Sequence, residues 1–107
     1  MVEKHDLGQA IKTVRAARGL SQEAFSDVSS RTYLSTLERG LKSPTLNKLA
    51  ELCEVMQVHP VTLLALAYAG DGGKADRLLA QVRQELDRVW QTADKTGFNL
   101  KKDRVEQ

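Results

Sequence analysis

The chain contains few cysteines, prolines and aromatic residues. Its 107 residues include one cysteine, two prolines, one tryptophan, two tyrosines and two phenylalanines. A single cysteine, Cys53, excludes an intrachain disulfide and a zinc site built on paired cysteines, which fits a reducing compartment. Nothing in the neighbouring sequence suggests a base that would activate Cys53, so we expect a small core residue. With so few aromatic residues, the core must consist mainly of leucine, valine, isoleucine and alanine.

Long apolar runs and a strong excess of one charge are also missing. The longest apolar run, residues 61–69, is interrupted by Thr62 and is far shorter than the roughly 20 residues of a membrane-spanning helix. The charged residues 1–6 lack the apolar stretch of a secretory signal. A net charge of +2 neither requires nor excludes a polyanionic partner. The sequence therefore predicts a cytoplasmic protein with no membrane partner.

Apolar residues recur at spacings of three and four along most of the chain, which predicts an all-α fold. The first helix starts at Leu7 with Asp6 as its cap and stops at Gly19. Four more are expected at residues 21–28, at residues 30–39, from Leu46 to just before Val58, and from Pro60 to Gly70. Their inward residues are expected to be Leu7, Ile11, Val14, Ala17, Ala24, Phe25, Val28, Leu34, Leu37, Leu46, Leu49, Ala50, Cys53, Met56, Leu63, Leu64, Leu66 and Ala67.

A glycine-rich segment, residues 71–73, is expected to be a flexible joint between two parts of the chain. Beyond it, residues Ala75, Leu79, Val82, Leu86, Val89 and Ala93 alternate spacings of four and three. This pattern predicts an amphipathic helix, widened by Leu78 and Trp90, that stops at Gly97 before a frayed tail at residues 101–107. The expected division is a domain at residues 1–70, followed by the joint, helix and tail at residues 71–107.

Two short helices joined by a tight break match the helix-turn-helix plan. Several motifs then occur in order: residues 7–12 with Arg15, residues 18–23, residues 33–40 and residues 43–46. Together they resemble the Cro/CI (XRE) family of DNA-binding regulators over residues 5–68. The resemblance implies a five-helix, lambda-repressor-like domain that binds double-stranded DNA and regulates transcription, here with an added C-terminal helix.

The third expected helix carries the candidate base-reading residues. With Leu34 and Leu37 facing inward, its outward residues are Arg31, Thr32, Ser35 and Thr36. A helix of this width fits the major groove, where an arginine can bond guanine O6 and N7 together. The resemblance places Arg31, Thr32 and Thr36 at base-reading positions, with Ser35 close by. The alternative is that these are ordinary surface residues.

The resemblance also implies contacts to the DNA backbone. Gln22 resembles a glutamine that grips a phosphate and braces the recognition helix, while Arg39 and Lys42 flank Gly40 where relatives contact phosphates. Tyr33 is expected to contribute its hydroxyl in the same way. Arg15 and Glu38 resemble an internal salt bridge between the first and third helices, so we interpret both as structural.

The turn before the recognition helix departs from the family pattern. Between Gln22 and Arg31 the chain is shorter by about two residues, and Ser29 and Ser30 stand where relatives have a Gly-Val-Ser type of turn. The second helix or its turn must be trimmed, which leaves the tilt of the recognition helix open.

The C-terminal helix is the expected means of self-association, because family members usually bind inverted half-sites as dimers. Its candidate interface residues are Leu79, Val82, Leu86, Val89 and Trp90. Alternatives are that this stripe docks on the protein's own core, that the fifth helix forms the dimer, or that tetramers form. A second hypothesis is an antitoxin-like interaction module whose C-terminal helix binds a partner protein.

An enzyme is not expected, because no nucleophile with a base, carboxylate pair, metal cluster or phosphate loop is found. His5 and His59 lie far apart without ligand spacing, and His59, before Pro60, is expected to be a cap or surface residue. The sequence therefore predicts no cofactor and no metal.

Overall fold

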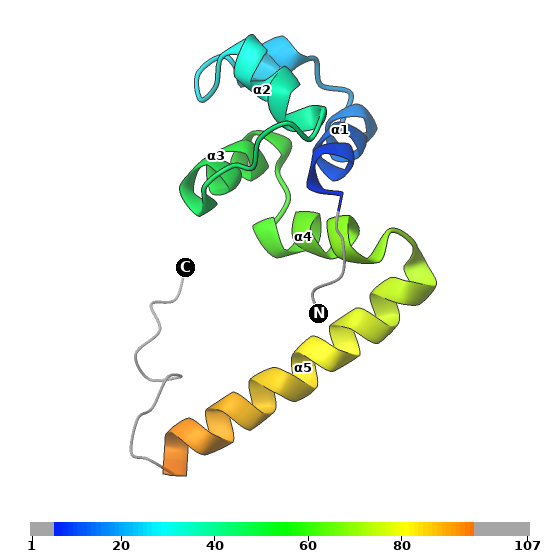
Figure 1. Cartoon of the computed structure of the whole chain (residues 1–107), viewed down its shortest axis with the longest axis vertical. Helices are drawn as coiled ribbons and strands as arrows, with labels where there is room; N and C mark the ends of the chain where they lie inside the picture. Colours follow the sequence, from blue (N-terminus) through cyan, green and yellow to red (C-terminus); the bar gives the residue numbers. More distant parts are fainter. Residues whose placement is uncertain (1–5, 96–107) are drawn as a thin grey trace. The chain divides into compact units, whose positions relative to one another are not determined.

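A computed structural model describes residues 6–95 of the chain. This part consists of five α-helices and one 3₁₀ helix (Figure 1), and no strand occurs within it. The elements are α1 (Leu7–Ala17), η1 (Gln22–Phe25), α2 (Arg31–Glu38), α3 (Leu46–Met56), α4 (Pro60–Ala69) and α5 (Gly72–Lys95). The predicted all-α fold is confirmed. The chain divides into two compact units, Met1–Ala75 and Asp76–Gln107.

Short polar side chains fix the starts of the helices in the first unit. Side-chain oxygens of Asp6, Ser30 and Thr45 accept hydrogen bonds of 2.9, 3.0 and 3.1 Å from backbone N–H groups three residues further on. These bonds satisfy N–H groups that have no partner inside the helix. His59 caps α4 through Nδ1, which accepts from the Val61 N–H at 3.0 Å, and Pro60 occupies the first helical position.

The first unit has one hydrophobic core, formed by α1, η1, α2, α3 and α4. Its largest fully buried side chains are Phe25, Ile11, Leu34, Leu37, Leu52, Met56, Leu63 and Cys53. Most of the predicted inward positions are confirmed as buried or half-buried, including Cys53 as a core residue.

Four predicted inward residues are instead exposed: Ala17, Ala24, Leu46 and Ala50. The buried stripe of α3 is formed by Leu49, Leu52, Cys53 and Met56, so Leu52 was missed. Position 50 lies about 100° round the helix from Leu49, which turns it away from the stripe. Leu46 is the first residue of α3, beyond the edge of the core, and is 79% exposed.

The predicted second helix at residues 21–28 is wrong in length and type. Only Gln22–Phe25 is helical, as a 3₁₀ turn, and Ser21 precedes it without a side-chain capping bond. The N–H groups of Val28 and Ser29 both donate to the Phe25 carbonyl at 2.9 Å, which curls the chain towards α2. The shortening expected from the spacing between Gln22 and Arg31 is therefore located in this helix.

Within the predicted joint at residues 71–73, Gly72 and Gly73 form the first turn of α5. The break lies one step earlier: Gly70, at φ 83°, ends α4, and Asp71 Oδ1 accepts a 2.9 Å bond from the Lys74 N–H. Helix α5 continues to Lys95, whereas the predicted stop at Gly97 and the tail at residues 101–107 lie outside the described residues.

In residues 6–95 no single helix is long and apolar enough to cross a membrane. Helices α3 and α4 pass a test of length and composition only as a pair bent by 100°. Both contribute buried side chains to the core of the first unit.

Candidate nucleic-acid interface

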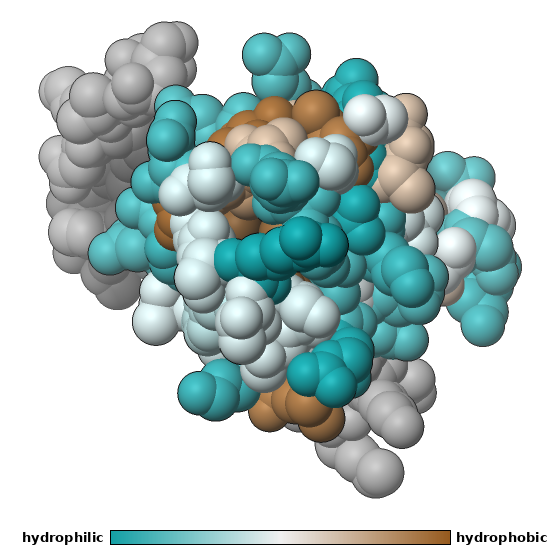
Figure 2. Space-filling view, turned by 90° about the horizontal axis from the view of Figure 1, so that it is seen from above, coloured by the Kyte–Doolittle hydropathy of each residue, from teal (hydrophilic) through white to brown (hydrophobic). Residues whose placement is uncertain are grey.

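Helix α2 combines a buried face with an outward polar face. Leu34 and Leu37 are 0% and 1% exposed, and both anchor the helix in the core. Arg31 and Thr32 are exposed on the other side. The view from above, the end where Figure 1 places η1 and α2, shows a mainly hydrophilic surface (Figure 2). Hydrophilic side chains cover the middle of this face, with separate hydrophobic areas above and below them in the view of Figure 2.

An open hollow of about 340 Å³ lies on the outward side of α2. It is lined by five of the eight residues predicted to contact DNA: Gln22, Arg31, Thr32, Ser35 and Arg39. The hollow therefore combines two guanidinium groups with an amide and two hydroxyls. All are hydrogen-bonding groups, and the two formal charges are positive, so the hollow suits an anionic partner with polar edges.

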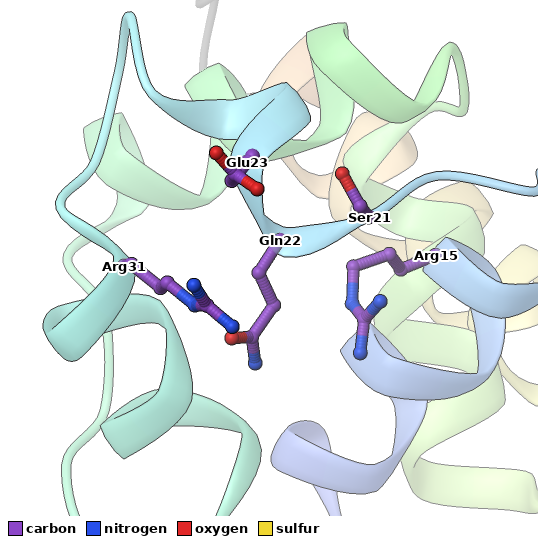
Figure 3. A pocket seen from close by; sticks show the side chains of 5 residues that line it. All are labelled: Arg15, Ser21, Gln22, Glu23 and Arg31. Carbon is purple, nitrogen blue, oxygen red and sulfur yellow. The ribbon is translucent and has the colours of Figure 1, made fainter.

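A second hollow of about 280 Å³ lies next to it and is lined by Arg15, Ser21, Gln22, Glu23 and Arg31. Figure 3 shows the Gln22 side chain between Arg31 and Arg15, with the Arg31 guanidinium directed towards the Gln22 amide. Gln22 and Arg31 line both hollows. The two hollows therefore share one residue at the start of η1 and one at the start of α2.

Glu38 binds two of the residues that line the second hollow, Arg15 and Gln22. It accepts from Arg15 Nε at 2.7 Å and from Arg15 Nη2 at 3.1 Å, which confirms the salt bridge implied by the resemblance. The hydrogen bond to Glu38 is the main reason that the pKa of Arg15 is raised. Arg15 Nη1 also donates to the Leu20 carbonyl at 2.9 Å. The guanidinium thus fixes the chain just before η1.

Gln22 belongs to the same network, because its Nε2 donates to Glu38 Oε1 at 3.1 Å. This bond orients the side chain and uses one of its two N–H groups. The second N–H and the carbonyl oxygen are not used by this bond and remain chemically suited to a phosphate or a base edge. A bracing role for Gln22 therefore has a direct geometric basis.

Three predicted contact residues line neither hollow. Tyr33 is half-buried and packs against the core, and the Thr36 hydroxyl donates to the Thr32 carbonyl at 2.9 Å. Lys42 is exposed in the loop after α2.

Sequence reasoning missed Lys48, on α3, whose Nζ donates to the Val28 carbonyl in the turn before α2. The same ammonium group lies 3.0 Å from Glu51 Oε1. Neither periodicity nor a motif indicates this bond, because it joins residues 20 positions apart on different elements.

Within residues 6–95 there is no group of three histidine, cysteine or acidic side chains that could hold a metal ion. Burial raises the pKa of the Cys53 thiol, which disfavours the reactive thiolate.

The predicted association stripe of α5 has no buried residue. Leu79, Leu86 and Val89 are 49%, 41% and 52% exposed, whereas Val82 and Trp90 are partly covered. On the flank of the stripe, the Arg83 guanidinium lies 5.8 Å from the centre of the Trp90 ring, a cation–π distance. The apolar side chains therefore form one exposed face along α5.

Comparisons with known proteins show which family the chain resembles in sequence. A family model described as helix-turn-helix matches residues 11–63, a range that contains all the residues of both hollows. An uncharacterized HTH-type transcriptional regulator of Sinorhizobium fredii, y4dJ, is 38% identical over 60 residues, which cover 54% of this chain and 78% of that protein. No solved structure gives a significant match. The chain therefore belongs to the XRE-type helix-turn-helix family.

Proposed function

We propose that this protein is a cytoplasmic, non-enzymatic transcriptional regulator that binds a specific sequence of double-stranded DNA. The observation that carries the proposal is the hollow on α2, where Gln22, Arg31, Thr32, Ser35 and Arg39 come together. The similarity to a protein named as a transcriptional regulator supports it independently. In this proposal α2 enters the major groove with its outward face against the bases.

Arg31 has the central role in reading the sequence. It is exposed at the first position of α2, where its side chain has room to reach a base edge. A guanidinium that donates two hydrogen bonds to guanine O6 and N7 contributes about 1–3 kcal/mol of discrimination. Thr32, Ser35 and Thr36 are shorter and contact bases, thymine methyl groups or nearby phosphates.

Contacts to the DNA backbone fix the position of α2. Arg39 follows α2 directly, Lys42 lies in the loop after it, and both are exposed. Together with Gln22 and Tyr33 they bind phosphates of the same half-site. Such contacts carry salt-dependent affinity but no sequence information.

Self-association through α5 completes the proposal. Three exposed large apolar residues on one helix, Leu79, Leu86 and Val89, are best covered by the same face of a second copy. A homodimer places two recognition helices on a pseudopalindromic site whose half-sites lie about 34 Å apart.

The DNA-binding part is tested by selecting preferred sequences from a random duplex pool and measuring the affinity for selected and scrambled DNA at several salt concentrations. We expect Arg31→Ala to lower the affinity for selected DNA by about 10- to 100-fold and to keep salt-sensitive binding to scrambled DNA. Arg77→Ala on α5 removes the same charge outside the hollows and is the matched control. An unchanged preference in Arg31→Ala would overturn the role of Arg31.

The dimer is tested by light scattering coupled to size-exclusion chromatography. Leu86→Glu places a charge in the middle of the apolar stripe and is expected to yield monomers, whereas Gln84→Glu adds the same charge at an exposed position off the stripe. A wild-type monomer would contradict self-association. If a stoichiometric partner protein then bound through α5, the antitoxin-like interaction module would replace this part of the proposal.

A further inference from the structure

The turn between η1 and α2 is tied to a third helix by one side chain. Lys48 Nζ, from α3, donates a hydrogen bond to the Val28 carbonyl. Glu51 Oε1, one turn further along α3, lies 3.0 Å from the same ammonium group. The Lys48 side chain is only 27% exposed, compared with 50% for Glu51. Most of the Lys48 side chain is therefore covered.

The turn is otherwise held by local hydrogen bonds. Its N–H groups at Val28 and Ser29 share one acceptor, the Phe25 carbonyl, and η1 has only four residues. The carbonyl groups of a turn have no regular helical partners, and a lysine ammonium group can donate a hydrogen bond to one of them. Lys48 supplies such a partner to Val28, while the Val28 side chain packs against the core.

We propose that Lys48 is a positioning residue that sets the orientation of α2, and thereby determines which DNA sequence the protein prefers. The inference rests on the proposed DNA-binding function. Only three peptide steps separate the fixed Val28 carbonyl from Arg31, so the start of α2 lies within about 10 Å of it along the chain. Lys48 acts through the backbone at Val28 and does not itself line either hollow.

The other end of α2 is fixed separately. Glu38, its last residue, is bound to Arg15 and Gln22. Loss of the Lys48 bond therefore loosens the N-terminal end of α2, which Leu34 still anchors in the core, while the C-terminal end stays in place. The displacement is largest at Arg31 and Thr32 and smallest near Glu38. The proposal thus predicts that preference is lost first at the base pair read by Arg31.

Three variants separate this role from a general effect on folding. Lys48→Met keeps most of the aliphatic stem and removes the donor, and Lys48→Arg restores a cationic donor. Glu51→Gln, the matched control, removes the ion pair but leaves the bond from Lys48 to Val28. For each variant and for wild type, the affinity for selected and for scrambled DNA is measured. The protein concentration in each assay is corrected for the fraction of folded protein, which is calculated from urea unfolding.

We expect Lys48→Met to reduce the ratio of selected to scrambled affinity by about tenfold, which corresponds to one good base contact. The salt dependence should be unchanged, because the phosphate-contacting residues remain. Lys48→Arg should recover at least part of the ratio, and Glu51→Gln should match wild type. An equal loss of both affinities in Lys48→Met, or an unchanged ratio, would overturn the proposal.

A second measurement needs no DNA. Amide hydrogen exchange followed by NMR should show faster exchange at Leu34, whose N–H donates to the Ser30 carbonyl in the first turn of α2, in Lys48→Met. Exchange at Arg39, which donates to the Ser35 carbonyl, should stay at the wild-type rate. If wild type shows no sequence preference, the proposed function fails. The difference in exchange between Leu34 and Arg39 still decides whether Lys48 holds the start of α2. Equal acceleration at both amides would overturn the positioning role.

Discussion

Arg15 and Glu38 form a two-bond ion pair, with Nε to Oε2 at 2.7 Å and Nη2 to Oε1 at 3.1 Å. Because Gln22 also donates to Glu38, one carboxylate joins α1, η1 and α2. The side chains of Arg15 and Glu38 are 15% and 5% exposed, so water contributes little to their solvation. The pair therefore links the stability of the fold to the orientation of Gln22 in the hollow.

Glu38→Gln should destabilise the protein by about 3 kcal/mol, because it leaves the covered Arg15 guanidinium without its counter-charge. Urea unfolding followed by circular dichroism measures this change. The matched control is Asp87→Asn in the exposed pair with Arg83, whose side chains are 47% and 70% exposed. We expect that change to cost less than about 0.5 kcal/mol. Similar costs at both sites would contradict the structural role of Glu38.

Gly8 is required where α1 crosses the end of α2. A Cβ at this position would lie 2.5 Å from the Leu37 carbonyl oxygen and 2.7 Å from that of Glu38. Both obstacles are backbone atoms, so Gly8→Ala should separate the two helices and cost about 2 kcal/mol despite the better helix propensity of alanine. Thermal unfolding measures the loss.

Gly73→Ala is the control for this substitution. Gly73 lies in the first turn of α5, where a Cβ would meet only the Asp71 side chain at 3.6 Å. Alanine should therefore stabilise α5 by about 0.5–1 kcal/mol through its helix propensity. A stabilised Gly8→Ala variant would show that α1 and α2 tolerate a wider separation than their contact indicates.

The sequence predicted those parts of the fold that depend on local periodicity. The apolar pattern within each helix predicted that Ile11, Leu34, Leu37 and Leu63 face inward, and all four side chains are buried. The Arg15–Glu38 pair was reached through the family resemblance, because two opposite charges 23 positions apart carry no local signal.

The remaining features arise from tertiary contacts. The 3₁₀ form of η1 depends on how residues 26–30 meet α2 and α3, and the Lys48 bond depends on the place where α3 passes that turn. Gly72 and Gly73 have a low helix propensity, yet they form the first turn of α5 behind the Asp71 cap. Packing and capping outweighed composition at each of these positions.

Gln57 ends α3 in a left-handed conformation, with φ 58° and ψ 45°. This region is unfavourable for residues with a Cβ, so Gln57→Gly should raise the free energy of unfolding by about 0.5–1 kcal/mol. The Gln57 carbonyl, which accepts from Arg18 Nη2 at 3.2 Å, is retained in the variant. Gly40→Ala tests the opposite change at φ 76° with open space around it, and should destabilise by a similar amount. A loss of stability in Gln57→Gly would contradict this explanation.

The buried Cys53 thiol should make stability depend on pH on the alkaline side. Burial raises its pKa in the folded state, so above about pH 8.5 the unfolded chain releases a proton that the folded chain retains. The free energy of unfolding should therefore be unaffected by this group below that pH and decrease above it. Cys53→Ala removes this contribution, and wild type should lose more stability than the variant between about pH 8 and pH 10. Parallel pH profiles of the two proteins would contradict the prediction.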